Sequence, residues 1–177
     1  MHKERDWCTV KILVLSDSHS GRIFMRHCID TVKPDHIIHL GDHYEDGTVI
    51  AEEYPHLRVH QVPGNCDFGG AAQSEPPVMC YDIGGVRIFM THGHMHGVKS
   101  GLDRLISAAA EMSAQVITFG HTHEALCFQT ETGVWVMNPG SCRSWSGSAG
   151  VIEIVDKKVS ACYVIKQAEL ELMQEQG

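Results

Sequence analysis

The stretch TVKILVLSDSH, residues 9–19, joins an almost continuous run of apolar and β-branched side chains to an aspartate and a histidine two positions apart. Such a run is typical of a β-strand that is buried on both faces. Asp17 and His19 cannot extend that strand into a core, because a carboxyl or imidazole group that is buried without partners costs free energy. We therefore expect the strand to end here, at a sheet edge where these side chains meet other polar groups.

The same pattern recurs four times along the chain. Short apolar stretches stop at polar residues in HIIHLGD (36–42), LRVHQVPGNCD (57–67), VRIFMTHGH (86–94) and VITFGHTH (116–123). In open α/β sheets, ligands bind at the carboxyl ends of the strands. The five loops are therefore expected to bring together one set of side chains: Asp17, His19, Asp42, Asn65, His92, His121 and His123.

The segments between the first three strands have the apolar spacing of helices. Apolar residues at i, i+3, i+4 and i+7 from Met25 predict an amphipathic helix over about 21–33. A second, short helix is expected around 48–54, between strands at 36–40 and 57–62. This alternation of strands and helices predicts a parallel sheet with right-handed crossovers.

The second half of the chain has the pattern of strands joined by tight turns. Gly84-Gly85 is a hairpin signal between strands at 78–83 and 86–91. A helix is expected to begin at Ser100, with Asp103 as its capping-box partner. Five further strands are expected at 116–119, 125–129, 134–137, 151–155 and 159–165.

Together these elements predict an α/β fold class in which two packed, mixed β-sheets are flanked by helices. One domain is expected over residues 1–177, because a chain of this length can bury a sufficient core. Its core covers about 9–165, and residues 166–177 form a polar, helix-prone tail. The glycine-rich stretches 66–74 and 141–150 are expected to be long loops beside a site.

Charge and composition exclude several classes of protein. Lys and Arg total 14 against 22 Asp and Glu, the net charge is -8 and no basic run is present, so no stable nucleic-acid complex is expected. No apolar stretch approaches the length of a membrane span. The seven cysteines form no CxxC motif, and the N-terminus lacks the apolar core of a signal peptide. These features favour a cytoplasmic protein with reduced, buried thiols, and they leave a homo-oligomer open.

The types of donor in the five loops indicate a metal centre. Carboxylate, imidazole and amide oxygen ligands suit Mn²⁺, Fe²⁺, Zn²⁺ or Ni²⁺, and the absence of thiolates argues against a structural zinc site. Asp42 carries two oxygens and can bridge two cations. Taken singly, DSHS also suits a helix cap, GNCD a turn, and each histidine pair a polar surface. Their shared position after strands favours one dinuclear centre.

The ordered set DSHS, GD, GNCD, THGH, GHTH and NPGS resembles the calcineurin-like metallophosphoesterase superfamily, and within it the small YfcE-like phosphodiesterase group, from Thr9 to about Ile165. The resemblance implies a four-layer fold and a phosphodiesterase that acts on a small phosphate-ester substrate with two divalent ions. Mn²⁺ is placed first, with Ni²⁺, Fe²⁺ or Zn²⁺ as alternatives. By this resemblance, the first ion is bound by Asp17, His19 and His123, the second by Asn65, His92 and His121, and Asp42 bridges them.

The resemblance also implies that a hydroxide held between the two ions attacks phosphorus. One departure concerns the leaving group, because the superfamily usually has a histidine directly after the asparagine, and here that residue is Cys66. A thiol is a weaker proton donor in this role. The nearest other candidate to assist the leaving group is His94. We count His94, together with the metal ligands Asp42 and Asn65, as the catalytic residues.

Two further interpretations stay open at this point. Asp67 is a candidate to orient His92 or His121, a role that carboxylates often take beside metal ligands. The resemblance also offers a different function, because the same fold serves as a protein-interaction scaffold in a retromer subunit whose site residues are altered. The complete set of ligands here favours the enzyme over a scaffold with little or no catalysis.

Overall fold

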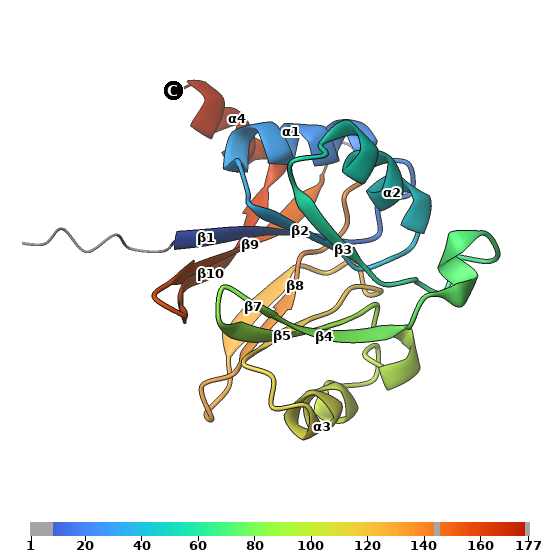
Figure 1. Cartoon of the computed structure of the whole chain (residues 1–177), viewed down its shortest axis with the longest axis vertical. Coiled ribbons are helices and arrows are strands. Elements are labelled where there is room, and N and C mark those ends of the chain that lie inside the picture. Colours follow the sequence, from blue (N-terminus) through green and yellow to red (C-terminus); the bar gives the residue numbers. More distant parts are fainter. Residues whose placement is uncertain (1–8, 144–145, 176–177) are drawn as a thin grey trace, which may run out of the picture.

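The structure, a computed structural model, describes residues 9–143 and 146–175. Two sheets of five strands each face one another, and helices cover the outer faces of both (Figure 1). Each sheet contains parallel and antiparallel neighbours. The predicted fold class, two packed mixed sheets between helices, is therefore confirmed.

The first sheet combines the first three strands with the last two, in the order β10-β9-β1-β2-β3. Strands β1 to β3 run parallel, and β9 and β10 pair antiparallel. Its strands are β1 (Thr9–Leu15), β2 (His36–His39), β3 (Arg58–Gln61), β9 (Ser148–Val155) and β10 (Lys158–Lys166). The helices over its outer face are α1 (Arg22–Val32), α2 (Tyr44–Glu53) and α4 (Gln167–Glu175) (Figure 1).

The second sheet is built from the middle of the chain, in the order β4-β5-β6-β8-β7. Its strands are β4 (Val78–Ile83), β5 (Val86–Thr91), β6 (Val116–Thr118), β7 (Leu126–Gln129) and β8 (Trp135–Asn138). The helix α3 (Asp103–Glu111) covers its outer face (Figure 1). Two short 3₁₀ helices, Ala71–Ser74 and His94–His96, lie in the loops.

Two helices begin elsewhere than the sequence predicts. α2 begins at Tyr44, four residues before the predicted start, because the carboxylate of Asp67 accepts the backbone N–H of Tyr44 at 2.8 Å. α3 begins at Asp103, after Leu102, and has no side-chain cap hydrogen bond, so the predicted capping box is wrong. Ser100 lies in the turn before the helix, where its N–H donates to a backbone carbonyl.

The strand that opens the first sheet is buried on both faces, as its sequence predicts. Leu13 and Leu15 pack in the core beneath α1, whereas Ile12 and Val14 pack in the core between the two sheets. This alternation follows from the strand, in which successive side chains point to opposite faces. Because all four side chains are fully buried, the end of β1, and with it Asp17, is held firmly in place.

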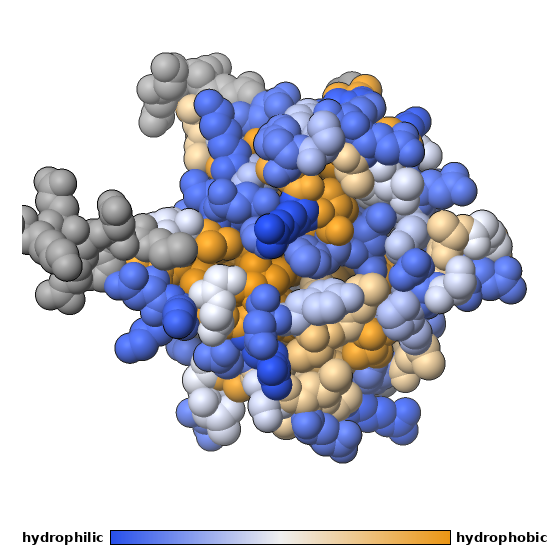
Figure 2. Space-filling view, in the orientation of Figure 1, coloured by the Kyte–Doolittle hydropathy of each residue, from blue (hydrophilic) through white to orange (hydrophobic). Residues whose placement is uncertain are grey.

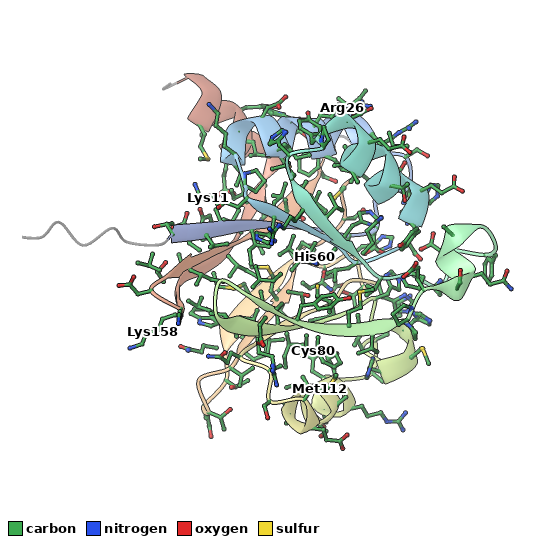
Figure 3. The ribbon with its side chains drawn as sticks, viewed as in Figure 1. Lys11, Arg26, His60, Cys80, Met112 and Lys158 are labelled. Atoms are coloured by element: carbon green, nitrogen blue, oxygen red, sulfur yellow. The ribbon has the colours of Figure 1, made fainter. Side chains whose placement is uncertain are left out.

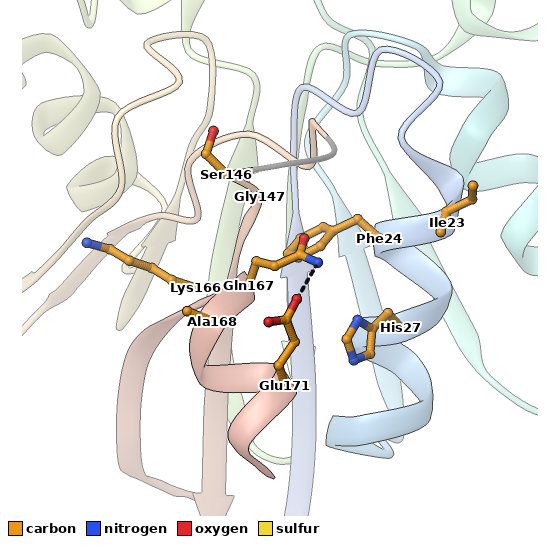
Figure 4. Close-up of a pocket in the computed structure, with 9 residues that line it drawn as sticks. All are labelled: Ile23, Phe24, His27, Ser146, Gly147, Lys166, Gln167, Ala168 and Glu171. Carbon is orange, nitrogen blue, oxygen red and sulfur yellow. Dashed lines mark hydrogen bonds between the residues drawn. The ribbon is translucent and has the colours of Figure 1, made fainter. Parts of the chain in front are cut away.

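The C-terminal helix forms part of the core. Leu170 of α4 is fully buried and belongs to the same apolar cluster as α1. A hollow of about 730 Å³ lies between these two helices, and its lining includes Phe24, His27 and Glu171 (Figure 4). None of the predicted site residues lines it, so size alone does not make this hollow the functional site.

One face of the molecule shows where the two sheets come together. Hydrophilic residues dominate the surface over the helices. Apolar residues are visible in the middle of this face, between the helices of the two outer layers and around the edge strands β3 and β4 (Figure 2). His60 of β3 and Cys80 of β4 mark the two edges (Figure 3). Within the described ranges, no helix combines the length and the apolar character needed to cross a bilayer.

Candidate metal centre

The seven predicted ligands all lie in loops that follow strands. Asp17 and His19 follow β1, Asp42 follows β2, Asn65 follows β3, His92 follows β5, and His121 and His123 follow β6. Four of them form the tightest group: the donor atoms of Asp17, His19, Asp42 and His123 lie within 4.8 Å of one another. Both sheets contribute to this group, so neither sheet could form it alone.

The other three candidates lie beside this group. His92 Nε2 is 3.1 Å from Asn65 Oδ1 and 3.5 Å from Asp42 Oδ1. The ring of His121 lies next to that of His92, with 5.1 Å between their centroids. The structure thus brings all seven predicted residues to one place, in two groups that both include Asp42.

Unpaired donor atoms show that this place fits metal ions. Asp17 Oδ1 and His19 Nε2 are buried and have no hydrogen-bond partner in the described part of the chain. Buried polar atoms are ordinarily paired, and a bound ion is one explanation for an atom that is not. Donors that share one ion at about 2.1 Å lie roughly 3–3.5 Å apart, and Asp17 Oδ1 is 3.0 Å from His123 Nε2. A divalent cation therefore suits both the chemistry and the spacing.

Asp42 faces the two groups with different oxygens. Its Oδ2 is 4.0 Å from His19 Nε2, and its Oδ1 is 3.5 Å from His92 Nε2. Burial by itself favours the neutral carboxyl, but His92 and the backbone N–H of Cys66, 2.9 Å from Oδ1, outweigh it and lower the pKa of Asp42. Asp42 is therefore ionised at neutral pH, with one oxygen directed to each group.

A backbone hydrogen bond fixes the ring of His92. Its Nδ1 donates to the carbonyl oxygen of Leu40 at 2.7 Å, so in the neutral ring Nε2 carries a lone pair. That nitrogen faces oxygens of Asn65 and Asp42, which are acceptors as well. A cation shared by these atoms turns their mutual repulsion into attraction, and the bond to Leu40 is the kind of support that orients metal-binding histidines.

Burial keeps two further imidazoles in the form that binds metal. It lowers the pKa of His19, where Asp42 opposes the effect, and it lowers the pKa of His121, where the neighbouring His92 adds to it. A histidine must be unprotonated to ligate a cation. The two rings are therefore available to metal ions at neutral pH.

Five of the seven ligands have left-handed backbone. The angle φ is +52° at Asp17, +41° at His19, +54° at Asp42, +69° at His121 and +61° at His123. A non-glycine residue in this region costs about 1 kcal/mol or more. These residues turn the chain sharply after each strand, so that the side chains of D-x-H and H-x-H point to one centre. Strain gathered at one place is typical of functional sites.

Two glycines let the loops approach each other this closely. A Cβ atom on Gly64 would overlap the carboxylate of Asp42, and a Cβ atom on Gly120 would overlap the side chains of Ser16 and Asp17. The glycines that precede Asn65 and His121 are therefore required by packing. No local pattern in the sequence indicated this, because the colliding atoms belong to other loops.

Asp67 does not orient the histidines, so that prediction is wrong. Its carboxylate accepts four backbone N–H groups, among them those of Asp42 at 3.0 Å and Gly64 at 2.7 Å. Among the described residues it makes no hydrogen bond to His92 or His121. Four amide donors occupy its two oxygens, and Asp67 instead joins the loops that follow β2 and β3.

The two residues considered for the leaving group both lie beside the centre. The thiol of Cys66 contacts the carboxylate of Asp42, and desolvation together with this hydrogen bond raises the pKa of the thiol. The ring of His94 is 5.5 Å from that of His92 and 6.1 Å from that of His121, between centroids. Cys66 is thus placed against the carboxylate of Asp42, and His94 against the second group.

Asn138, in the motif NPGS, holds a loop of the candidate metal centre in place, a role that the sequence did not predict. From the end of β8 its Nδ2 donates to the carbonyl of Gly120 and to the hydroxyl of Thr122, at 3.0 Å each. These bonds hold the loop that carries His121 and His123. The motif was part of the resemblance, but its role is visible only in the folded chain.

Asp46 is a second supporting residue without a signal in the sequence. It is buried in α2, accepts hydrogen bonds from Ser18 Oγ at 2.7 Å and the backbone N–H of Ser20 at 2.9 Å, and lies 3.5 Å from Arg22 Nε. It therefore fastens α2 to the loop that contains Asp17 and His19. In sequence, an acidic residue near the start of a helix is usually solvated, so only the tertiary contact shows its role.

Known proteins match this chain over most of its length. The family model described as "Calcineurin-like phosphoesterase superfamily domain" matches residues 10–158. The "Probable metallophosphoesterase YsnB" of Bacillus subtilis (strain 168) is 35% identical over 140 residues, which cover 76% of each chain. The sequence similarity thus extends across all five loops of the candidate centre.

Two solved structures have the same fold. YfcE, a phosphoesterase from E. coli, aligns with a TM-score of 0.59 at 21% identity, over 86% of this chain and 97% of that chain. Vacuolar protein sorting 29 from Cryptosporidium parvum aligns with a TM-score of 0.68 at 17% identity, over 90% and 99%. At these identities the likeness concerns the fold alone.

Proposed function

Because this chain belongs to the calcineurin-like phosphoesterase superfamily, we propose that it is a phosphodiesterase that works with two divalent metal ions. The proposed substrate is a small phosphate ester, and the proposed location is the cytoplasm. Mn²⁺ is the first ion to test, followed by Ni²⁺, Fe²⁺ and Zn²⁺, since the donor set suits all four.

The observation that supports this proposal best is the arrangement around Asp42. One of its oxygens faces His19 and the other faces His92. Unpaired buried atoms, Asp17 Oδ1 and His19 Nε2, lie on the first side. On the second side, His92 is held by a backbone carbonyl so that Nε2 faces Asn65. A single carboxylate with donors on both sides is the arrangement that a two-metal site needs.

When bound by these donors, two divalent ions lower the pKa of a shared water and offset charge on the phosphoryl oxygens. The chain contributes rigidity. Asp17 Oδ2 accepts hydrogen bonds from Ser16 Oγ at 2.6 Å and from the backbone N–H of His121 at 3.1 Å, which directs Oδ1 into the centre. Donors fixed in advance need no reorganisation during reaction, and such preorganisation accounts for much of enzymatic rate enhancement.

A hollow beside the centre supports a small substrate. It has a volume of about 370 Å³, and Cys66 and His43 in its lining directly follow the candidate ligands Asn65 and Asp42. The lining also includes Arg22, Phe68 and the acidic residues Glu45, Asp46 and Asp67. This volume is within the range of small-molecule sites, about 300–1,000 Å³. Arg22 is the basic residue of this lining and lies 3.5 Å from Asp46, so its charge is shared with that carboxylate. Phe68 is 90% exposed at the rim. We assign assistance of the leaving group to His94, which lies beside the second group of donors.

The alternative function, a protein-interaction scaffold of the same fold, has less support. The likeness to vacuolar protein sorting 29 concerns the fold, and a fold does not by itself determine function. A scaffold has no need for seven converging donors, five of which are held in strained backbone. The centre therefore favours catalysis.

The decisive experiment measures hydrolysis of bis(4-nitrophenyl) phosphate and of 4-nitrophenyl phosphate by the full chain, with each of the four ions. We expect turnover of the diester to exceed that of the monoester. The variant His92→Ala should lose most of this activity. His60→Ala is a matched control, because His60 hydrogen-bonds to His36 on β2 rather than to the centre, and it should retain the activity.

Elemental analysis of the same preparations gives the number of ions in each chain. A protein that holds two ions and hydrolyses neither ester would contradict the enzyme and favour the scaffold. Hydrolysis of the monoester alone would contradict the diester preference while leaving a phosphoesterase. Equal losses in His92→Ala and His60→Ala would contradict the assignment of the site.

A further inference from the structure

Two cysteines face each other across the gap between the sheets. Cys127 lies on β7, the edge strand of the second sheet, and Cys162 lies on β10, the edge strand of the first. Their sulfur atoms are 3.5 Å apart, and Cys127 Sγ is 3.2 Å from the carbonyl oxygen of Cys162. We propose that Cys127 and Cys162 are a redox pair that forms a reversible disulfide between the two sheets.

The geometry favours this bond over any other pairing of the described cysteines. A disulfide has sulfur atoms about 2.05 Å apart, so closing this gap requires an approach of about 1.5 Å, within reach of side-chain rotation and small movements of two edge strands. Both residues are partly buried rather than sealed in the core, contrary to the sequence prediction of buried thiols. A thiol-disulfide reagent can therefore reach them.

The pKa values of the two thiols differ, and this difference affects which sulfur attacks in disulfide exchange. The hydrogen bond between the two thiols lowers the pKa of Cys127, whereas that bond and burial raise the pKa of Cys162. Cys127 is thus the attacking thiolate. By contrast, Cys28 and Cys142 are fully buried, and burial raises the pKa of Cys142 to about 12. These two thiols are expected to be inert.

The proposed oxidant is a low-molecular-weight disulfide such as oxidised glutathione. The Cys127 thiolate attacks one of its sulfur atoms and forms a mixed disulfide, and a glutathione thiolate leaves and takes up the proton lost by Cys127. The Cys162 thiolate then attacks the Cys127 sulfur, and the second glutathione leaves with the proton of Cys162. The protein loses two hydrogens and two electrons, and one oxidised glutathione becomes two reduced glutathiones.

The bond would join two edge strands that belong to different sheets. Cys127 and Cys162 are 35 positions apart in the chain, so the disulfide closes a long loop and removes entropy from the unfolded state. Cys127 also lies four positions after His123, on the strand that leaves the loop of the candidate metal centre. Oxidation would therefore fix the base of that loop to the opposite sheet.

The test treats the full chain, in Mn²⁺-containing buffer, with mixtures of reduced and oxidised glutathione. Free thiols are then alkylated, and the digest is analysed by mass spectrometry. We expect a peptide cross-linked between residues 127 and 162, and its loss when dithiothreitol is added. The melting temperature of the oxidised protein should exceed that of the reduced protein by about 5–10 °C.

The variants Cys127→Ser and Cys162→Ser should each abolish both the cross-link and the rise in melting temperature. Cys80→Ser is the matched control, because Cys80 is also partly buried on an edge strand, β4, and it should leave both unchanged. Failure to detect the cross-linked peptide in excess oxidised glutathione would overturn the proposal. So would an equal rise in melting temperature in Cys162→Ser, or a cross-link in which Cys80 replaces either partner.

Discussion

Residues with left-handed backbone occur at both ends of the paired sheets, and they have a different role at each end. At one end, the turns Gly84-Gly85 and Asp156-Lys157 close the β4–β5 and β9–β10 hairpins with φ between +49° and +83°. The turns touch, since a Cβ atom on Gly85 would meet the side chain of Lys157. At the other end, five candidate ligands have φ between +41° and +69°.

The difference lies in what the side chains do. Two-residue turns with positive φ match the twist of the strands they join, so the hairpins themselves favour this backbone. Within the described ranges, none of the buried unpaired side-chain atoms belongs to a residue of these turns, whereas Asp17 Oδ1 and His19 Nε2 lie at the other end. Left-handed backbone alone therefore indicates a turn, and left-handed backbone with unpaired buried donors indicates a site.

The largest effect is expected at the residue that joins the two groups of donors. Asp42→Asn should reduce the binding of both ions, because Asp42 directs one oxygen to each side. Hydrolysis of the diester should fall by more than the roughly 100-fold that loss of a supporting residue behind a metal ligand can cost. Asn65→Ala should mainly deplete the second site, since Asn65 lies beside His92.

Elemental analysis gives the number of ions bound by each variant, and titration with Mn²⁺ gives their affinity. If Asp42→Asn keeps two tightly bound ions, Asp42 does not bridge them. Equal depletion of both ions in Asn65→Ala would argue that the two groups are not distinct sites.

Smaller effects on metal binding and on stability are expected when a glycine is replaced by alanine at either end of the paired sheets. Gly64→Ala should weaken metal binding about 10- to 100-fold, because the new Cβ would overlap the Asp42 carboxylate. Gly85→Ala, the matched substitution at the hairpin end, should lower the free energy of unfolding by about 1–2 kcal/mol, because φ is +83° there. It should leave the number of bound ions unchanged.

Thermal unfolding and Mn²⁺ titration of the two variants separate these outcomes. Loss of ions in Gly85→Ala would show that the two ends are coupled through the sheets. Full metal affinity in Gly64→Ala would show that the loops after β2 and β3 can move apart without harm, and the close approach would then be incidental.

The smallest effect is expected at Cys66. Its thiol contacts Asp42 and its pKa is raised, but general acid catalysis matters little for a good leaving group. Cys66→Ala should change kcat/KM for a nitrophenyl diester by less than about tenfold. Cys66→His should improve alkyl esters more than nitrophenyl esters. The assay compares both ester types at matched metal content, and a loss of a hundredfold in Cys66→Ala would mean that the thiol takes part in the chemistry.

The strands with strong local patterns were predicted well. β1, β4 and β5 have the predicted bounds, since apolar runs and the Gly84-Gly85 turn specify them directly. The start of α2 was missed because Asp67, which stabilises it, belongs to the loop after β3. β9 begins at Ser148, three residues before its predicted start, through pairing with β10 that adds Ser148 opposite Lys166.

The sequence by itself determined which side chains could bind metal and that each follows a strand, because donor type and apolar periodicity are properties of short segments. Only the tertiary structure decided how they face one another: that Asp42 directs one oxygen to His19 and one to His92, that Leu40 fixes the His92 ring, and that Asn138 holds the last loop. These contacts join segments far apart in the chain. Their geometry follows from how two sheets pack, which no single stretch of sequence specifies.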